Sequence, residues 1–512
     1  MIVDPSQDNS PPTPLRTDTK TAEEWKLEGN EHFKKGEYNA AVTCYSESLS
    51  IQPSAPVFAN RSFCHLRLEN FGTAISDATE AIKLDDTYIK GYYRRASANY
   101  ALRKYPEAIK DFKEQVRLTP NNAEVRSKYD SIKKEWKSIQ YLQAMERTEE
   151  VASEIFAKDI DSYVISSDYT GPRFTFPLTP ENCPLSLISE ETINYYRTGK
   201  QLPLRTAIDI LLSVKQVLHK EPNVVTMQIP DTGVTVVGDT HGQFNDLLLI
   251  FEKKGFPGPS NKFVFNGDFV DRGSYSVEIV LLLFLLKLRF PSDLILLRGN
   301  HETHNMNSMF GFEGEVKAKY QEKLYQLFKE VFCDLPLCAV LTDERTPNEL
   351  GATRVFVVHG GIPSKKNVTI EDIQQVHRYV QPPSEDCIFS ELIWNDPQDM
   401  PGLTPSQRGV GHQFGPDVTA SFLANNNLSY MIRSHQVQDE GFMSHHNHKL
   451  FTVFSAPNYC DSMTNKAAIA TVWGREKRID GEDRPEFYTY SASPLEHVKA
   501  MKYASSMFQR MM

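Results

Sequence analysis

The stretch FVFNGDFVDRGSYS, residues 263–276, combines a strand-like beginning with an unusual concentration of charge. Its apolar run ends at a glycine, and two aspartates follow, Asp268 and Asp271, with Arg272 directly behind the second. A single aspartate at this position would be explained by capping of the next helix. Two anions and a cation at the mouth of a buried strand predict a binding or catalytic site.

Five further short apolar runs lie on either side of this stretch, with helical stretches between them. They are VTVVG (234–238), LILLRG (294–299), RVFVVHGG (354–361), YMIRSH (430–435) and LFTVFSAP (450–457). Strands that alternate with helices are typical of an α/β domain whose sheets are covered by helices. The run IVLLLFLL (279–286) is too short to span a bilayer and is predicted to be a buried helix.

Polar side chains follow nearly all of these runs, where ligand sites of α/β sheets gather. In chain order they are Asp239, His241, Asp268, Asn300, His359 and His435. Carboxylate, imidazole and amide groups without thiolate suit manganese, iron or zinc. So many ligands exceed one tetrahedral site, which predicts two ions that share a bridging carboxylate. Asp268 is the expected bridge because it lies between the two ligand groups in the chain.

Residues 22–122 follow a different periodicity. Tyr38, Phe71 and Tyr105 are each followed three residues later by an alanine, and they recur at a period of about 34 residues, typical of helix–turn–helix solenoids. This part resembles the tetratricopeptide repeat, in three copies. We expect a disordered tail over 1–21 and a capping helix with a linker over 123–165.

The composition bounds the class of protein. The chain has 512 residues, 40 % of them hydrophobic and 24 % charged, which predicts a soluble protein of two or three domains. Its formal charge of −10 argues against a nucleic-acid partner. The seven cysteines include no CxxC pair, and the polar N-terminus lacks the apolar core of a signal peptide. We therefore expect a cytoplasmic and nuclear protein without a membrane partner.

Seven motifs together resemble the phosphoprotein phosphatase family of serine/threonine phosphatases. They are GDTHGQ (238–243), GDFVDRG (267–273), RGNHE (298–302), HGG (359–361), SQRGVGHQFG (406–415), RSHQ (433–436) and SAPNYCD (455–461). The repeats ahead of them narrow the resemblance to the tetratricopeptide-bearing branch. It implies an α/β metallophosphoesterase domain over 166–490, with a central β-sandwich flanked by helices. It also implies a C-terminal regulatory helix over 491–512.

The resemblance also assigns the metal ligands. Asp239, His241 and Asp268 would hold one ion, and Asp268, Asn300, His359 and His435 the other. Two divalent ions about 4 Å apart lower the pKa of a shared water and provide a hydroxide nucleophile. We expect manganese or magnesium, with iron and zinc as alternatives.

Other residues would handle the proton and the phosphate. His301 is the expected general acid, and Asp271 would orient it and raise its pKa so that the imidazole stays protonated. Arg272 and Arg408 would bind the phosphate oxygens, because a planar guanidinium binds two oxygens at once. Asn300 and Tyr459 are expected in the same pocket. Phe310 departs from the family, which usually has tyrosine there.

The repeats carry a candidate receptor site. Lys26 and Asn30 share a face of the first helix, Asn60 lies in the second repeat, and Lys90 and Arg94 share a face in the third. These five match the carboxylate clamp of the family. The clamp implies binding of the Glu-Glu-Val-Asp tail of the ninety-kilodalton heat-shock chaperone.

The resemblance, together with the order of the two domains, implies autoinhibition. Glu69 lies at a turn of the second repeat and could pair with Arg272 or Arg408 if the repeats fold over the site. Binding of the chaperone tail, or loss of the C-terminal helix, would then raise activity. The expected function is a phosphoserine/phosphothreonine phosphatase. The alternatives are a catalytically silent scaffold and a phosphoesterase that acts on nucleotides or nucleic acid.

Overall fold

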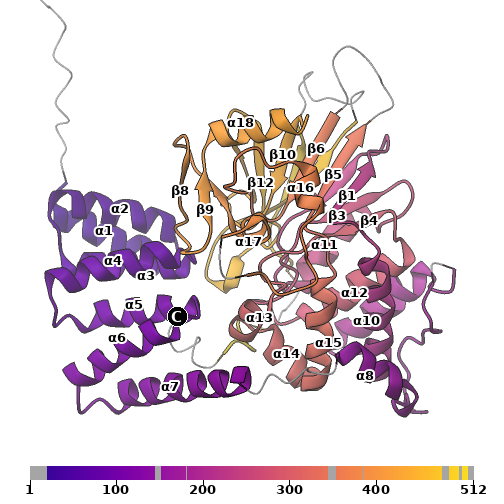
Figure 1. The fold of residues 1–512 in the computed structure, drawn as a ribbon, viewed down its shortest axis with the longest axis horizontal. Helices are drawn as coiled ribbons and strands as arrows, with labels where there is room; N and C mark the ends of the chain where they lie inside the picture. Colours follow the sequence, from indigo (N-terminus) through magenta and orange to yellow (C-terminus); the bar gives the residue numbers. More distant parts are fainter. Residues whose placement is uncertain are drawn as a thin grey trace, which may run out of the picture.

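The computed structural model describes residues 20–144, 151–179, 181–343, 353–383, 386–474, 484–494 and 499–505. An all-helical domain lies beside an α/β domain (Figure 1). Within the described ranges, no helix combines the length and the apolar character needed to cross a membrane. Most of the predicted N-terminal tail lies outside these ranges, and the described chain begins just ahead of the first helix, with Thr21 as its N-cap.

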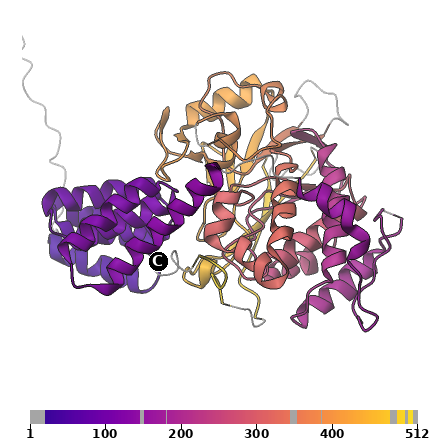
Figure 2. The same cartoon turned by 60° about the horizontal axis from the view of Figure 1, so that its bottom comes forward.

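Three helix pairs form the first domain, and a long helix follows them (Figures 1 and 2). Tyr38, Phe71 and Tyr105 each begin the second helix of a pair, and the alanines three residues later are fully buried. The predicted tetratricopeptide solenoid is therefore confirmed. Its helices are α1 (Ala22–Lys34), α2 (Tyr38–Ile51), α3 (Ala55–Arg67), α4 (Phe71–Leu84), α5 (Ile89–Ala101), α6 (Tyr105–Leu118) and the following α7 (Ala123–Ala144).

The second domain begins earlier than the sequence predicts. Helix α8 (Ala152–Asp159) packs against α15 (Glu322–Cys333), and Phe156 is only 1 % exposed in the core beneath them. The Glu330 carboxylate also accepts a hydrogen bond from the backbone N–H of Ala152 at 2.5 Å. The prediction placed this stretch within a capping helix and linker over 123–165, but the packing of α8 makes it part of the α/β domain.

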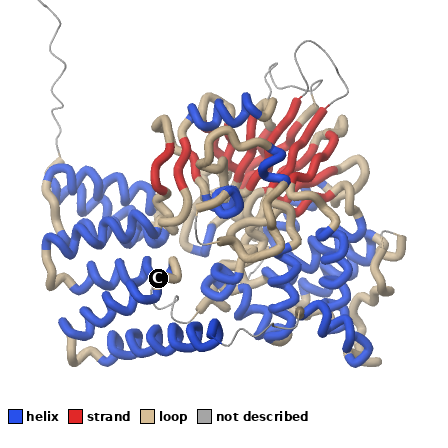
Figure 3. The backbone as a smooth tube through the Cα atoms, viewed as in Figure 1, coloured by secondary structure: helices blue, strands red, loops and turns tan. Residues whose placement is uncertain are grey.

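Two β-sheets pack face to face at the centre of the second domain (Figure 3). The larger sheet has the order β1 (Val224–Gln228), β5 (Cys338–Asp343), β6 (Thr353–Val358), β10 (Tyr430–Arg433), β12 (Leu450–Val453) and β11 (Phe442–His445). The other has the order β14 (Glu486–Tyr490), β13 (Ala467–Val472), β2 (Val234–Val237), β3 (Lys262–Phe265) and β4 (Leu294–Leu296). All six predicted strands are present. Within each sheet, those that carry site residues run parallel, so their carboxyl ends meet at one edge.

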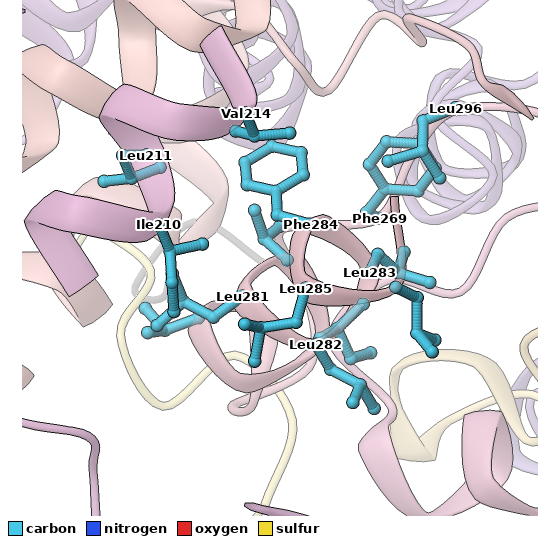
Figure 4. Close-up of a cluster of buried hydrophobic side chains, with 14 of the residues drawn as sticks. Ile210, Leu211, Val214, Phe269, Leu281, Leu282, Leu283, Phe284, Leu285 and Leu296 are labelled. Carbon is cyan, nitrogen blue, oxygen red and sulfur yellow. The ribbon is translucent and has the colours of Figure 1, made fainter. Parts of the chain in front are cut away.

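Helices cover the outer faces of the sandwich and complete the predicted fold. The predicted buried helix is α12 (Ser276–Arg289), whose side chains share one apolar cluster with Ile210, Leu211 and Val214 of α10 (Leu204–His219) (Figure 4). A small third sheet consists of β7 (Asp396–Pro397), β9 (His412–Phe414) and β8 (Leu403–Pro405). The remaining α-helices are α9 (Ile193–Arg197), α11 (Phe244–Lys254), α13 (His304–Phe310), α14 (Phe312–Lys319), α16 (Ile370–Gln374), α17 (Ile388–Trp394) and α18 (Pro416–Asn425).

The described residues of the predicted C-terminal helix over 491–512 do not form a helix. Its described residues, 491–494 and 499–505, form turns and irregular backbone. The backbone N–H of Met501 donates to the Arg272 carbonyl at 2.6 Å, and that of Ser505 donates to the Met309 carbonyl at 3.0 Å. These bonds to the α/β domain take backbone groups that a helix would use internally. Residues 495–498 and 506–512 lie outside the described ranges.

Candidate active site

The predicted metal ligands converge at one edge of the sandwich. Asp239, Asp268 and Asn300 lie just beyond β2, β3 and β4, while His359 and His435 lie just beyond β6 and β10. The Nε2 atom of His359 is 3.2 Å from Asp268 Oδ2, 2.9 Å from Asn300 Oδ1 and 3.3 Å from His435 Nδ1. Strand ends that are far apart in the chain thus form one cluster.

The cluster contains two groups of possible ligands that share Asp268. One is His241, Asp268 and His301, and the other is Asp268, His359 and His435; within each group the ligand atoms lie within 4.8 Å of one another. Asp239 lies beside both, with Oδ2 3.7 Å from His241 Nε2 and Oδ1 3.8 Å from His359 Nδ1. All six predicted ligands are brought together, and Asp268 occupies the place expected of a bridge.

Neighbouring groups fix the orientation of the ligands. His241 Nδ1 donates a hydrogen bond to the Val270 carbonyl at 3.0 Å, and His359 Nδ1 donates one to the Asn266 carbonyl at 2.8 Å. The protonated nitrogen of each ring is thus Nδ1, and Nε2 keeps the lone pair that can ligate a metal ion. Carbonyl partners such as these carry no signal in the sequence. The Glu302 carboxylate accepts three backbone N–H bonds at 2.8 Å each, one of them from Asp268, and so holds the loop that carries it.

The chemistry of the cluster fits divalent cations. Burial, together with the Asp268 charge, raises the pKa of Asp239 to about 8, and burial also raises that of Asp268. Burial lowers the pKa values of His241 and His435. His435 Nε2 is buried, and no hydrogen-bond partner for it occurs among the described residues. A bound cation would stabilise the carboxylates and use this nitrogen.

Backbone strain concentrates in the same loops. His241, Asp268, Asp271, Arg272 and His435 have φ values of 42°, 50°, 70°, 66° and 72°. Left-handed backbone costs a residue other than glycine of order 1–3 kcal/mol, and it persists where the surrounding structure imposes it. The strain places these side chains at the mouth of the sandwich.

His301 and Asp271 form the predicted pair, but the predicted pKa shift is wrong. His301 Nδ1 lies 2.7 Å from Asp271 Oδ2, and Asp271 also accepts bonds from Asn307 Nδ2 at 3.2 Å and from the Phe312 N–H at 2.8 Å. Burial, and then the Arg272 charge, lowers the pKa of His301 instead of raising it. Burial also raises the pKa of Asp271 to about 7. The predicted shift considered only the neighbouring anion and ignored burial.

The two predicted phosphate-binding arginines are buried and positioned by other groups. Arg272 lies over the ring of Phe310, with its guanidinium carbon 3.7 Å from the ring centroid, a cation–π contact. Arg408 Nε donates to Asp396 Oδ2 at 2.6 Å, and Nη2 donates to the His435 carbonyl at 2.8 Å. Asp396 and the ring of Phe310 were not recognised as supports from the sequence.

A cleft of about 520 Å³ leads to the cluster, and both domains line it. Glu69, at the turn between α3 and α4, forms an ion pair with Arg272 and accepts a bond from the Tyr459 hydroxyl at 3.3 Å. Burial alone would raise the pKa of Glu69, but the charges of Arg272, His301 and Arg408 outweigh it and lower the pKa. Of the two arginines considered in the sequence, the structure pairs Glu69 with Arg272.

The surrounding contact between the domains is close. The Thr73 N–H donates to the Gln407 carbonyl at 2.9 Å. A Cβ on Gly72 would lie 2.7 Å from the backbone nitrogen of Gly409, so the two backbones touch. Buried apolar side chains of both domains share one cluster, with Met306, Met309 and Phe310 from the α/β domain. The repeats are thus seated on the catalytic face.

The five predicted receptor residues fall on the first helix of each pair. Asn30 Oδ1 accepts a bond from Asn60 Nδ2 at 3.3 Å, which brings the first two repeats together. Lys26 pairs with Glu23 on its own helix at 3.0 Å. The Arg94 guanidinium stacks on Phe63, 3.6 Å from the ring centroid, while Lys90 is exposed.

Comparison with known proteins agrees with this architecture. Family models match at residues 27–54 and 89–122 (Tetratricopeptide repeat), 129–226 (PPP5 TPR repeat region) and 233–439 (Calcineurin-like phosphoesterase).

Similar proteins span nearly the whole chain. Serine/threonine-protein phosphatase 5 of Homo sapiens is 43 % identical over 96 % of this chain and 94 % of its own length. Serine/threonine-protein phosphatase T of Aspergillus oryzae is 39 % identical over 97 % of this chain and 99 % of its own. A solved protein serine/threonine phosphatase from Saccharomyces cerevisiae, 39 % identical, covers 62 % of this chain and 98 % of that one with a TM-score of 0.57. The chain therefore belongs to the family of serine/threonine-protein phosphatases 5 and T, and it is a metal-dependent phosphoprotein phosphatase.

Proposed function

We propose that this phosphatase hydrolyses phosphoserine and phosphothreonine with two divalent ions, manganese or magnesium, held by the cluster around Asp268. The observation that carries the proposal is the pair of ligand groups that meet at this one carboxylate. When bound, the ions supply a nucleophilic water and withdraw electrons from the phosphoryl group. The chain's own residues orient the substrate and move the proton.

His301 protonates the departing serine or threonine oxygen, with Asp271 holding the ring. The low pKa of His301 reflects burial and the nearby Arg272 cation. A substrate phosphate that displaces Glu69 from Arg272 replaces the single negative charge of that carboxylate with a larger one, which favours the protonated imidazole. The pair is thus set to become a proton donor when substrate arrives.

Arg272 and Arg408 bind the phosphate oxygens that do not react, and Asn300 and Tyr459 lie beside them. Glu69 now occupies Arg272, so substrate and repeat domain compete for the same guanidinium. We propose that this competition keeps basal activity low.

Assay of a phosphothreonine peptide tests the reaction. The full chain should show slow turnover with manganese. A chelator should abolish this turnover and added manganese should restore it, because hydrolysis of the phosphate ester requires the metal ions that the ligand cluster holds. Phosphate release is the measurement. Absence of turnover, with or without residues 1–150, would favour a silent scaffold. Preference for a nucleotide ester would favour a phosphoesterase that acts on nucleotides or nucleic acid.

We further propose that the repeat groove binds the acidic C-terminal tail of the ninety-kilodalton heat-shock chaperone. Asn30 and Asn60 lie in contact, and Lys90 offers an exposed cation on the third repeat. Amide and ammonium groups on one face suit a terminal carboxylate. The seven free thiols support a reducing location, which we propose to be cytoplasm and nucleus.

Binding of a labelled peptide that ends in Glu-Glu-Val-Asp tests the receptor. Lys90→Ala should weaken the affinity about 10- to 100-fold, since a hydrogen bond to a charged group contributes about 1.5–3 kcal/mol. Fluorescence anisotropy measures it. Lys83→Ala, on the exposed end of α4, is the matched control and should leave affinity unchanged. Equal binding of a peptide with an amidated C-terminus would refute a carboxylate clamp.

A further inference from the structure

The first repeat holds a cluster of metal-binding side chains that the catalytic mechanism does not use. Glu28 and His32 lie one turn apart on α1, and Cys44 lies on α2. One ligand atom from each lies within 4.8 Å of the other two. Carboxylate, imidazole and thiol are the three donor types that zinc accepts in proteins.

The surroundings support a metal site in two ways. Glu37 Oε2 lies 2.5 Å from His32 Nδ1, so a carboxylate holds the imidazole through this nitrogen and leaves Nε2 for an ion. The site is also accessible, because the side chains of His32 and Glu28 are 31 % and 37 % exposed. Cys44 is buried behind them, so the thiol closes the inner side of the site.

We propose that Glu28, His32 and Cys44 bind a zinc ion, with a solvent molecule in the fourth position. Binding releases the proton of the Cys44 thiol to solvent and forms the sulfur–zinc bond. Lys20, which pairs with Glu28, gives up this carboxylate to the ion. The ion would tie α1 to α2 beside the turn that holds Gly36 and Glu37, and these two residues line the catalytic cleft.

Cobalt titration of the full chain, with its catalytic site already loaded with manganese, tests the proposal. Thiolate bound to cobalt gives a near-ultraviolet charge-transfer band, and the catalytic ligands include no thiolate. We expect a band that saturates at one cobalt per chain and disappears when zinc is added. Cys44→Ser should abolish it, and Glu37→Gln should weaken cobalt binding about 10- to 100-fold.

Matched variants keep the test decisive. Cys387→Ser removes a half-buried thiol outside the cluster and should keep the band. Glu28→Gln changes a partly exposed group and should weaken binding without unfolding, as checked by circular dichroism. The proposal is overturned if no band forms, if it survives Cys44→Ser, or if Cys387→Ser removes it.

Discussion

Replacing His301 with asparagine lowers kcat for a phosphothreonine peptide by about 10²–10⁴-fold, the contribution of a general acid. Asparagine retains a polar side chain but cannot carry the proton that Asp271 helps to hold. The serine or threonine oxygen must then leave unprotonated. Steady-state kinetics on the peptide measures the loss.

Two comparisons separate an acid from a structural or ligating role. An aryl phosphate with a good leaving group needs little protonation, so His301→Asn should slow it much less than the peptide. Because His301 also belongs to one possible ligand group, metal content is measured as well and should not change. His304→Asn alters a nearby histidine that contacts Tyr325, and it should keep activity within a few-fold. An equal loss on both substrates would rule out the proton-transfer role.

Replacing Glu69 with glutamine raises kcat/KM at least tenfold. Glutamine cannot form the ion pair with Arg272, and removal of one partner of a buried pair costs about 3–5 kcal/mol. A tenfold rise in kcat/KM requires that only about 1.4 kcal/mol of this free energy stabilises the conformation in which the repeats cover the active site. A small phosphate ester is the best substrate, because it reports access to Arg272 rather than peptide recognition.

The control for this variant is Glu80→Gln, which removes a solvent-exposed repeat carboxylate paired with Lys83. It should leave kcat/KM unchanged. Deletion of residues 1–150 should raise kcat/KM at least as much as Glu69→Gln does. If neither the deletion nor Glu69→Gln changes turnover, the repeats do not inhibit the enzyme.

The sequence predicted the strands and the ligands because both are local signals. Each apolar run ends in a glycine or a polar side chain, as after β2, β3 and β4, and parallel strands bring such ends together. The pairing of Glu69 with one of two arginines was predicted from the carboxylate at the turn of the second repeat together with the family resemblance, which implies that the repeats fold over the site. The strand ends needed only the residues beside each strand.

Features set by tertiary packing were not predictable. The sequence placed Phe156 and its helix in the linker because the apolar core that buries them is formed by residues far away in the chain. The pKa of His301 depends on its burial and on charges from both domains, those of Arg272 and Glu69. The described C-terminal residues are irregular where their N–H groups bond to Arg272 and Met309. Backbone carbonyls such as that of Asn266 have no signature in the side-chain pattern.

The seam at Gly72 and Gly409 has a consequence for how release occurs. Where Gly72 meets Gly409 no side chain separates the two backbones, so the dispersion contact at this point declines steeply with the first ångström of separation. Conformations in which the two domains are only partly separated therefore retain little of the contact energy and are sparsely populated. An intermediate turnover rate in a sample then measures the fraction of molecules whose repeat domain has separated from the catalytic domain, rather than the distance of separation in each molecule.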